Sequence, residues 1–376
     1  MTSRGHNPTR DHGIGSDKTK TFLRQNITHL HPSATISIMQ SSAHGHAFGA
    51  DMTKMDIPIR TRADDCDSLQ DADTTPGASV LPVASIGEES FCEGRQYHHY
   101  RSGRYLLPND RVEQDREEVK HFMLLRLTDG KHFLAPIDDA NLRKVIDLGT
   151  GTGTWAMEVA DRFPSAEVTG TDLSPIQPDW SPPNVKFFVD DIEDEWVSGN
   201  DFDLIHARHV FPFIKDPATL TRRAFEHLAP GGWLELQDLG HVVLCDDGTM
   251  PPDYPIARFF DQITEAWGTF GADLRVGTKL EDMFRATGFV NVETRAFKIP
   301  IGAWLREVKD KELGLSFRIV IEMVISALCG AIATVEGWTD EDRDKFTAKC
   351  DSALRDQGVH AYMYCYFVLG QKPLER

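Results

Sequence analysis

The sequence contains little cysteine, no long uncharged apolar segment and fewer basic than acidic residues. Its six cysteines form no CxxC pair and no metal-ligand spacing, so we expect free thiols in a reducing compartment and no metal site. The most apolar run, residues 319–335, contains Glu322 and is shorter than the ~20 residues that span a bilayer. The first residues, MTSRGHNPTRDHG, lack the apolar core of a secretory signal. These features predict a cytoplasmic protein that does not enter membranes.

The charge balance is acidic, with 58 aspartates and glutamates against 40 lysines and arginines and a net charge of −18. Such a surface repels phosphate backbones, so no nucleic-acid-binding face is expected. The 376 residues are 40% hydrophobic and 26% charged, which is typical of globular proteins and excludes collagen-like and wholly disordered chains. The length allows two or three domains, or one large domain with a tail.

The first 90 residues are poor in aromatic side chains. They contain Phe22 and Phe48, whereas all seven tryptophans and all seven tyrosines lie beyond them. Ser, Thr, Asp, His and Gly dominate this segment, so it cannot bury enough apolar surface to offset the entropy lost on ordering. We therefore predict a disordered tail over residues 1–90 and a folded domain over residues 91–376.

Beyond this tail, strand-like and helix-like segments alternate. Residues 110–127 predict a helix capped by Asp110, and residues 217–232 predict one that begins after Asp216 and ends at Pro-Gly-Gly. The other predicted helices are 154–163, a pair within 254–288 and a long helical insertion at 305–356. The predicted strands are 144–149, 166–173, 184–191, 201–208, 233–239, 291–301 and 360–372.

This alternation predicts an α/β fold. We expect a Rossmann-like, doubly wound and mostly parallel sheet of seven strands, with helices on both faces and the helical insertion before the last strand. The insertion carries the apolar run, and as a lid it would suit a hydrophobic ligand. A core helix or a dimer face is the alternative for the same pattern.

A glycine-rich loop follows the first strand of the alternation. Residues 145–153 are VIDLGTGTG, and glycines in such a loop allow the backbone to pass close under a nucleotide-sized ligand. Asp172 ends the next strand, where an acidic side chain accepts hydrogen bonds from ribose hydroxyls; an ordinary turn residue is the alternative. A dinucleotide motif would place its last glycine at Thr154. Asp147 opposes a pyrophosphate but suits a sulfonium group, so the loop favours S-adenosylmethionine over NAD.

Six phrases together resemble a known family. They are GRQYHHYRSGRYLLPNDRVEQDR (94–116), VIDLGTGTGTWAMEVAD (145–161), TGTDLSPIQPDWSPPNVKF (169–187), FDLIHARHV (202–210), LAPGGWLELQD (228–238) and HAYMYCYFVLGQKP (360–373). The set resembles the class I S-adenosylmethionine-dependent methyltransferases and, more narrowly, the fungal LaeA-like group of secondary-metabolism regulators and pathway methyltransferases. The regulators carry a cysteine where this sequence has Thr150, and this departure favours a pathway enzyme.

The resemblance implies a set of cofactor-binding residues. It places Gly149, Thr150 and Gly151 at the methionine and ribose parts of the cofactor and Asp172 at the ribose hydroxyls. It places Asp191 at the adenine amino group, with Ile192 against the ring. The resemblance and the glycine-loop argument together predict these cofactor-binding residues: Asp147, Gly149, Thr150, Gly151, Asp172, Leu173, Asp191, Ile192, His206 and Ala207, with Arg208 beside them.

Methyl transfer requires alignment and exclusion of water, and a general base helps when the acceptor still holds its proton. The candidate bases are His209, His206 and Tyr105, and Tyr97 and Tyr100 lie in the same segment as Tyr105. Structural roles for these histidines, and packing roles for the tyrosines, are the alternatives.

The sequence therefore predicts an S-adenosylmethionine-dependent methyltransferase that modifies a small and hydrophobic fungal secondary metabolite. The alternative is a LaeA-like regulator, nuclear through a partner protein, that acts in a protein complex. A cofactor-binding module without turnover is a third hypothesis. The acceptor atom and the oligomeric state have no signature in the sequence.

Overall fold

The computed structural model describes residues 81–82, 90–92, 95–101, 105, 107–138 and 140–374. All of them belong to the second of two compact units, Ser68–Arg376. The tail predicted over residues 1–90 lies outside the described residues except at 81–82 and 90, so its disorder stays a prediction.

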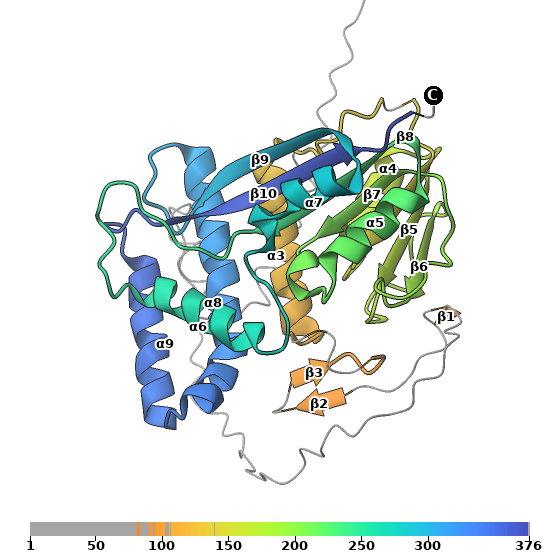
Figure 1. Ribbon diagram of the computed structural model, residues 1–376. Coiled ribbons are helices and arrows are strands. Elements are labelled where there is room, and N and C mark those ends of the chain that lie inside the picture. Colours follow the sequence, from red (N-terminus) through yellow and green to blue (C-terminus); the bar gives the residue numbers. More distant parts are fainter. Residues whose placement is uncertain are drawn as a thin grey trace, which may run out of the picture. The chain divides into compact units, whose positions relative to one another are not determined.

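A mixed sheet of eight strands organises the described part of the chain (Figure 1). Its strands are β1 (Leu81–Pro82), β4 (Lys144–Leu148), β5 (Glu167–Asp172), β6 (Val185–Val189), β7 (Phe202–Arg208), β8 (Leu228–Leu239), β9 (Val290–Pro300) and β10 (Tyr362–Gln371). Their spatial order is β1-β6-β5-β4-β7-β8-β10-β9. The central five strands, β6 to β8, are parallel, whereas β1, β10 and β9 pair antiparallel. Apart from the two-residue β1, this is the predicted seven-stranded sheet, which is confirmed.

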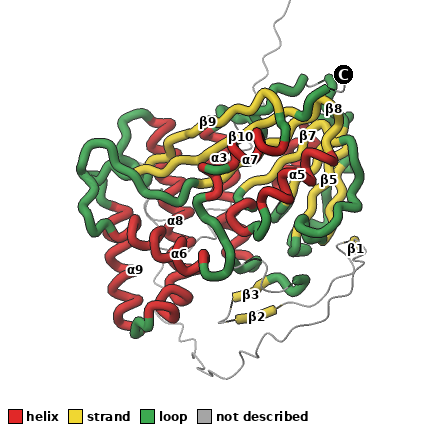
Figure 2. The backbone as a smooth tube through the Cα atoms, in the orientation of Figure 1, coloured by secondary structure: helices red, strands yellow, loops and turns green. Residues whose placement is uncertain are grey.

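Helices cover the sheet as the alternation predicts (Figure 2). They are α3 (Arg111–Leu127), α4 (Thr154–Arg162), α5 (Pro217–His227), α6 (Pro255–Gly268), α7 (Leu280–Thr287), α8 (Val308–Glu336) and α9 (Asp340–Arg355). Two 3₁₀ turns, η3 (Phe211–Phe213) and η4 (Val276–Thr278), and a hairpin of β2 (Ser90–Cys92) and β3 (Arg95–Tyr97) complete the fold. The helix predicted over 217–232 ends at His227, because Pro230 and the two glycines after it leave the helix and begin β8.

The central strands are buried on both faces, so successive residues point into different clusters. Val145 and Leu204 pack with Trp155 of α4 on one face. Ile146 and Ile205 pack with residues of α5 and α7 on the other. The residues that follow along β4 and β7 keep this alternation. The face on which each of them lies decides whether its side chain can reach a ligand.

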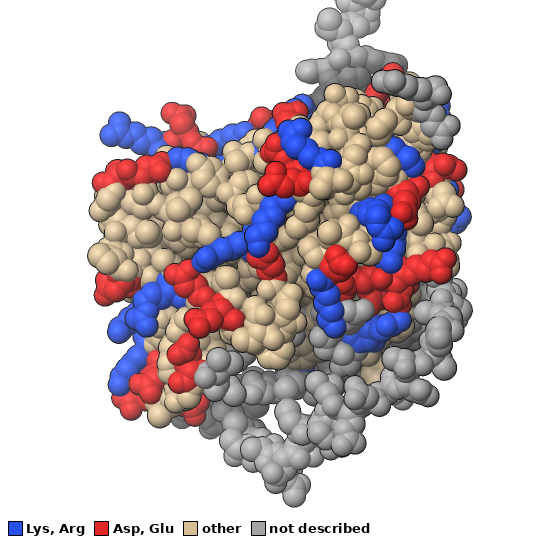
Figure 3. Space-filling view, in the orientation of Figure 1, with Lys and Arg blue, Asp and Glu red and all other residues tan. Residues whose placement is uncertain are grey.

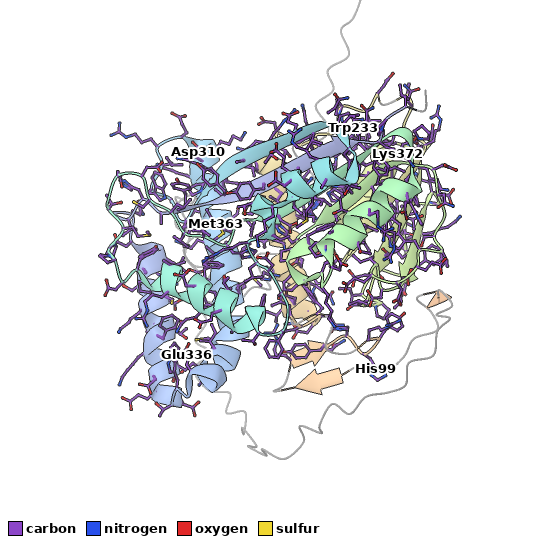
Figure 4. All side chains as sticks on the ribbon, viewed as in Figure 1. His99, Trp233, Asp310, Glu336, Met363 and Lys372 are labelled. Carbon is purple, nitrogen blue, oxygen red and sulfur yellow. The ribbon has the colours of Figure 1, made fainter. Side chains whose placement is uncertain are left out.

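A third cluster joins α3, α6, α8 and α9 to the first half of β10. The helix α3 lies between α8 and the sheet (Figure 1). The predicted insertion contains α8 and α9, and Asp310 and Glu336 mark the two ends of α8 in Figure 4. Among the described residues α8 alone is long and apolar enough to cross a membrane, over Val308–Gly330, although half of that window is buried, and core helices pass the same test.

Four cysteines are free thiols: Cys245, Cys329, Cys350 and Cys365. In the part of the chain that the structure describes, no cluster of three or more His, Cys, Asp or Glu side chains has the geometry of a metal site. On the face in Figure 3, basic side chains lie interspersed with acidic ones.

Candidate cofactor and acceptor site

The strand order reverses at β4, between β5 and β7, and this switch point is where doubly wound sheets bind ligands. A pocket of about 990 Å³, including the part open to solvent, lies at the carboxyl ends of these strands and against α3. Eight predicted site residues line it: Tyr105, Gly149, Gly151, Asp172, Leu173, Asp191, Ile192 and His209. Arg208 lines it as well, whereas Tyr97 and Tyr100 are outside the lining that the structure describes.

The glycine loop has the conformation that its sequence predicts. Gly149, Gly151 and Gly153 all have positive φ angles of 58° to 76°, the left-handed region that favours glycine. A Cβ on Gly149 would lie 2.4 Å from Cγ2 of Val210, so that glycine is needed for packing. A Cβ on Gly151 would meet no atom within 4 Å, and Gly151 lines the pocket. This open space beside the loop can receive a ligand.

Asp172 is held in place by the loop that it faces. Its Oδ2 accepts a hydrogen bond from the backbone N–H of Gly151 at 2.8 Å, and its Oδ1 accepts one from Ser174 at 2.9 Å. Burial raises the pKa of Asp172 to about 6, and the two amides offset only part of that effect. Each oxygen keeps a lone pair for a further donor, as two ribose hydroxyls would require.

Two adjacent acidic residues, Asp190 and Asp191, directly follow β6. Asp191 is 4% exposed, and its Oδ1 accepts a hydrogen bond from the backbone N–H of Glu193. Asp190 also lines the pocket, and burial raises its pKa to about 6. The sequence analysis missed Asp190, although the Asp-Asp pair at the end of a predicted strand was a usable signal.

Four predicted site residues are placed elsewhere: Asp147, Thr150, His206 and Ala207 are not part of the pocket lining. Nδ1 of His206 lies 2.7 Å from Oδ1 of Asp147, and the hydroxyl of Thr150 donates to Oδ2 at 2.7 Å. The His206 ring is fully buried and stacks on Trp155 with 3.8 Å between ring centroids. We call Asp147, Thr150 and His206 the Asp147 cluster.

Strand alternation explains this placement. Asp147 and His206 continue the face of β4 and β7 that packs on α4, and Ala207 points into the opposite core. The geometry therefore argues against His206 as a base that touches the acceptor. It also argues against a direct contact from Asp147 to a cationic ligand, because Asp147 is buried and lies outside the pocket lining.

His209 and Tyr105 do line the pocket, but neither is a strong base. Burial, together with Lys120 and Arg208, holds the pKa of His209 well below its ordinary value, so its ring is neutral at pH 7. Burial and the nearby Glu117 hold the pKa of Tyr105 well above its ordinary value, so it keeps its hydroxyl proton. A base role for either residue stays a prediction, and these shifts make it a weak one.

A row of charged residues on α3, which is not among the residues predicted from the sequence, borders the first pocket and the pocket that adjoins it. The α3 charged row consists of Glu113, Arg116, Glu117 and Lys120. Lys120 donates a hydrogen bond to Glu117 Oε1 at 2.6 Å, and Arg116 bonds both glutamates. Lys120 is 4% exposed, and burial lowers its pKa to about 8. Their i, i+3, i+4, i+7 spacing places these four residues on one face of α3 and could have indicated the row. Acidic residues near the start of a helix, however, are also common where that end of the helix lies in solvent.

A second pocket of about 590 Å³ adjoins the first. It shares Tyr105, Lys120, His209 and Phe213 with the first pocket, so these residues form the boundary between the two. Its remaining walls are mostly apolar and include Phe260, Ile263 and Trp267 of α6 and Phe317, Val320 and Ile321 of α8. Apolar surface thus dominates both chambers, and they differ in charge: carboxylates line the first, whereas none of the described residues that line the second is acidic.

The sheet order, with an antiparallel β10 inserted between β8 and β9, and the glycine loop facing an acidic strand end define a class I methyltransferase fold. A family profile described as "Methyltransferase domain" matches residues 119–294. The methyltransferase PytC of Aspergillus terreus is 37% identical over 325 residues, which cover 85% of this chain and 98% of PytC. The secondary metabolism regulator LAE1 of Cochliobolus heterostrophus is 31% identical and matches over 68% of this chain and 84% of its own. The protein-methionine methyltransferase LaeA of Emericella nidulans is 30% identical, over 79% and 81%.

The chain therefore belongs to the methyltransferase family that contains PytC and LaeA, and it is an S-adenosylmethionine-dependent methyltransferase. The residues present fit this cofactor. The open space beside Gly151 can take its ribose, and Asp172 can accept the ribose hydroxyls. Glu117 and Asp190 suit a positively charged sulfonium. Nη2 of Arg208 lies 3.0 Å from Nδ1 of the buried His121, and this contact leaves other guanidinium N–H groups for a carboxylate.

Proposed function

We propose that this protein methylates a small hydrophobic metabolite in a fungal secondary-metabolite pathway, in the cytoplasm and without nucleic-acid or membrane partners. The observation that carries the proposal is the second pocket, whose walls are mostly apolar and which shares four lining residues with the carboxylate-lined first pocket. An apolar acceptor would bury its skeleton against α6 and α8 while its reacting atom faces the boundary. The similarity to PytC over nearly the full length of that protein supports a pathway enzyme.

S-adenosylmethionine supplies an activated methyl group on a sulfonium sulfur. The protein mainly positions the two reactants and excludes water, and such positioning contributes about 7–11 kcal/mol in well-oriented reactions. Gly151 and Asp172 hold the nucleoside part, and α3 and α8 shield the boundary between the pockets. Because His209 is neutral and Tyr105 keeps its proton, the acceptor is expected to arrive as a good nucleophile or to ionise in the site.

A second candidate is a LaeA-like regulator that methylates protein. The observation in its favour is the similarity to a protein-methionine methyltransferase at 30% identity. A methionine side chain is apolar, and its thioether sulfur needs no base, so it is also compatible with the second pocket. This alternative would act in a protein complex and, through a partner, in the nucleus.

A label-partition experiment separates the two. Purified full-length protein is mixed with methyl-labelled S-adenosylmethionine, a small-molecule extract of the producing fungus and its protein fraction. We expect label in an organic-extractable product, whose mass identifies the acceptor. Label in protein alone would support the regulator. Cofactor binding without any transfer would instead support a binding module and contradict both candidates.

A further inference from the structure

The boundary between the two pockets carries one buried cation, and this residue has no role in the function described above. Lys120 lines both pockets, and its side chain is 4% exposed. Its ammonium group has three N–H donors, but in the described structure only Glu117 accepts one of them. A buried ammonium with unused donors is costly unless another acceptor reaches it.

Further groups face the same point. The ring of His209 reaches the boundary from the end of β7, and its buried Nε2 has no hydrogen-bond partner among the described residues. Asp238 of β8 is fully buried, and burial raises its pKa well above the ordinary value, against the opposing effect of Lys120. His241 is neutral, because burial lowers its pKa to about 4. Burial keeps Cys365 a thiol by raising its pKa.

The remaining charges sit on α3 itself. Burial disfavours an ionised Glu117, but Lys120 and Arg116 outweigh it and lower the pKa of Glu117 to about 2. Arg116 pairs with Glu113 and Glu117, and Lys120 also pairs with Glu117, so the two positive and two negative charges of the row balance. Lys120 is therefore the charged group at the boundary that keeps donors for a ligand.

We propose that Lys120 binds and stabilises an ionised oxygen of the methyl acceptor, so that the acceptor class is an acidic hydroxyl, such as a phenol or enol, on an apolar skeleton. This inference rests on the proposed function, because it assumes a small-molecule acceptor in the second pocket. The role of Lys120 also explains why the boundary can lack a strong base, although His209 and Tyr105 are both weak ones. A phenol that ionises beside Lys120 loses its proton to solvent and needs no strong base.

The step balances. The anionic acceptor oxygen donates an electron pair to the methyl carbon, a carbon–oxygen bond forms while the carbon–sulfur bond breaks, and that bond's electron pair stays on sulfur. The product is a methyl ether, and the cationic sulfonium becomes a neutral thioether. No metal or oxidant takes part in this balance, and Lys120 keeps its hydrogen bond to Glu117 throughout.

The test measures binding and uses two probes that differ in one proton. Full-length protein saturated with S-adenosylhomocysteine is titrated with 4-nitrophenol, whose phenolate absorbs visibly, and with 4-nitroanisole, which cannot ionise. We expect the wild-type protein to bind nitrophenolate about ten- to a hundredfold more tightly than Lys120→Met does. Both proteins should bind nitroanisole equally. Lys131→Met, at an exposed lysine just beyond α3, is the matched control and should behave as wild type.

Two readouts keep the proposal testable if Lys120→Met folds poorly. Lys120→Arg retains the charge and should retain the preference for nitrophenolate. In the wild-type protein, at pH values where the probe is ionised, the preference should persist up to about pH 8 and should fall above it, because the ammonium then loses its proton. Equal binding of nitrophenolate and nitroanisole by the wild-type protein at pH 7 would overturn the inference. Label in a small molecule in the partition experiment would still preserve the proposed function in that case.

Discussion

The Asp147 cluster and the α3 charged row are both buried near the carboxyl ends of β4 and β7. They differ in whether their unused hydrogen-bonding atoms face a pocket. In the Asp147 cluster both carboxylate oxygens have protein partners, and the imidazole packs flat on Trp155. In the α3 charged row Lys120 keeps donors that face both pockets. Burial alone therefore does not mark a functional residue. A group whose spare hydrogen-bonding atoms face a pocket can bind a ligand, whereas the Asp147 cluster lies outside the pocket lining, the Nε2 of His206 included, and stabilises the fold.

The largest expected effect comes from removing the carboxylate of the Asp147 cluster. Asp147→Ala would leave His206 and Thr150 buried without their partner, so we expect the free energy of unfolding to fall by about 3 kcal/mol. Denaturant unfolding measures this loss. Asp161→Ala, at an exposed aspartate on α4, is the control and should stay within about 0.5 kcal/mol of wild type. Unchanged stability with lost cofactor binding would instead place Asp147 in the site.

At Asp172 we expect the opposite result, a loss of cofactor affinity without a matching loss of stability. Removing its carboxylate in Asp172→Ala should weaken S-adenosylmethionine binding about ten- to a hundredfold, because charged hydrogen bonds contribute about 1.5–3 kcal/mol each. The unfolding free energy should not fall in parallel, since burial of this charge already disfavours its ionised form. Calorimetric titration gives the affinity, and Asp161→Ala again serves as the control. Wild-type affinity in Asp172→Ala would remove Asp172 from the site.

A smaller effect is expected from pH. Burial raises the pKa values of Asp172 and Asp190 to about 6, so both are mostly ionised at pH 7 and mostly protonated at pH 5. Protonation removes acceptors for the ribose and negative charge near the sulfonium. We expect affinity for S-adenosylmethionine to fall as the pH drops through 6, by up to about tenfold per group. The Asp172→Asn variant should show a flatter profile, and an unchanged slope there would assign the titration to another group.

Much of the fold could be predicted from the sequence because its signals are local. The period of the apolar residues, Asp110 and Asp216 as helix caps, and the glycines of the loop each depend on a few neighbouring residues. The helix over 217–232 was predicted too long because helix-forming residues run up to Pro230, and the pairing of Leu228 with Phe202 is a tertiary contact.

The candidate site could be predicted only in part. Gly151 and Asp172 carry motif positions, and the structure places both at the pocket. His206 carries a motif position too, but it points to the α4 face of its strand. Lys120 had no motif at all, since a lysine on a helix usually lies in solvent.

The sequence by itself determined the class of protein: its alternating elements, its glycine loop and its acidic strand ends all follow from residue type and spacing. The tertiary structure decided which polar groups are paired and which are open. That choice depends on which face of a strand meets α4 and on where α3 lies between α8 and the sheet. Such contacts join residues far apart in the chain, and no local period encodes them.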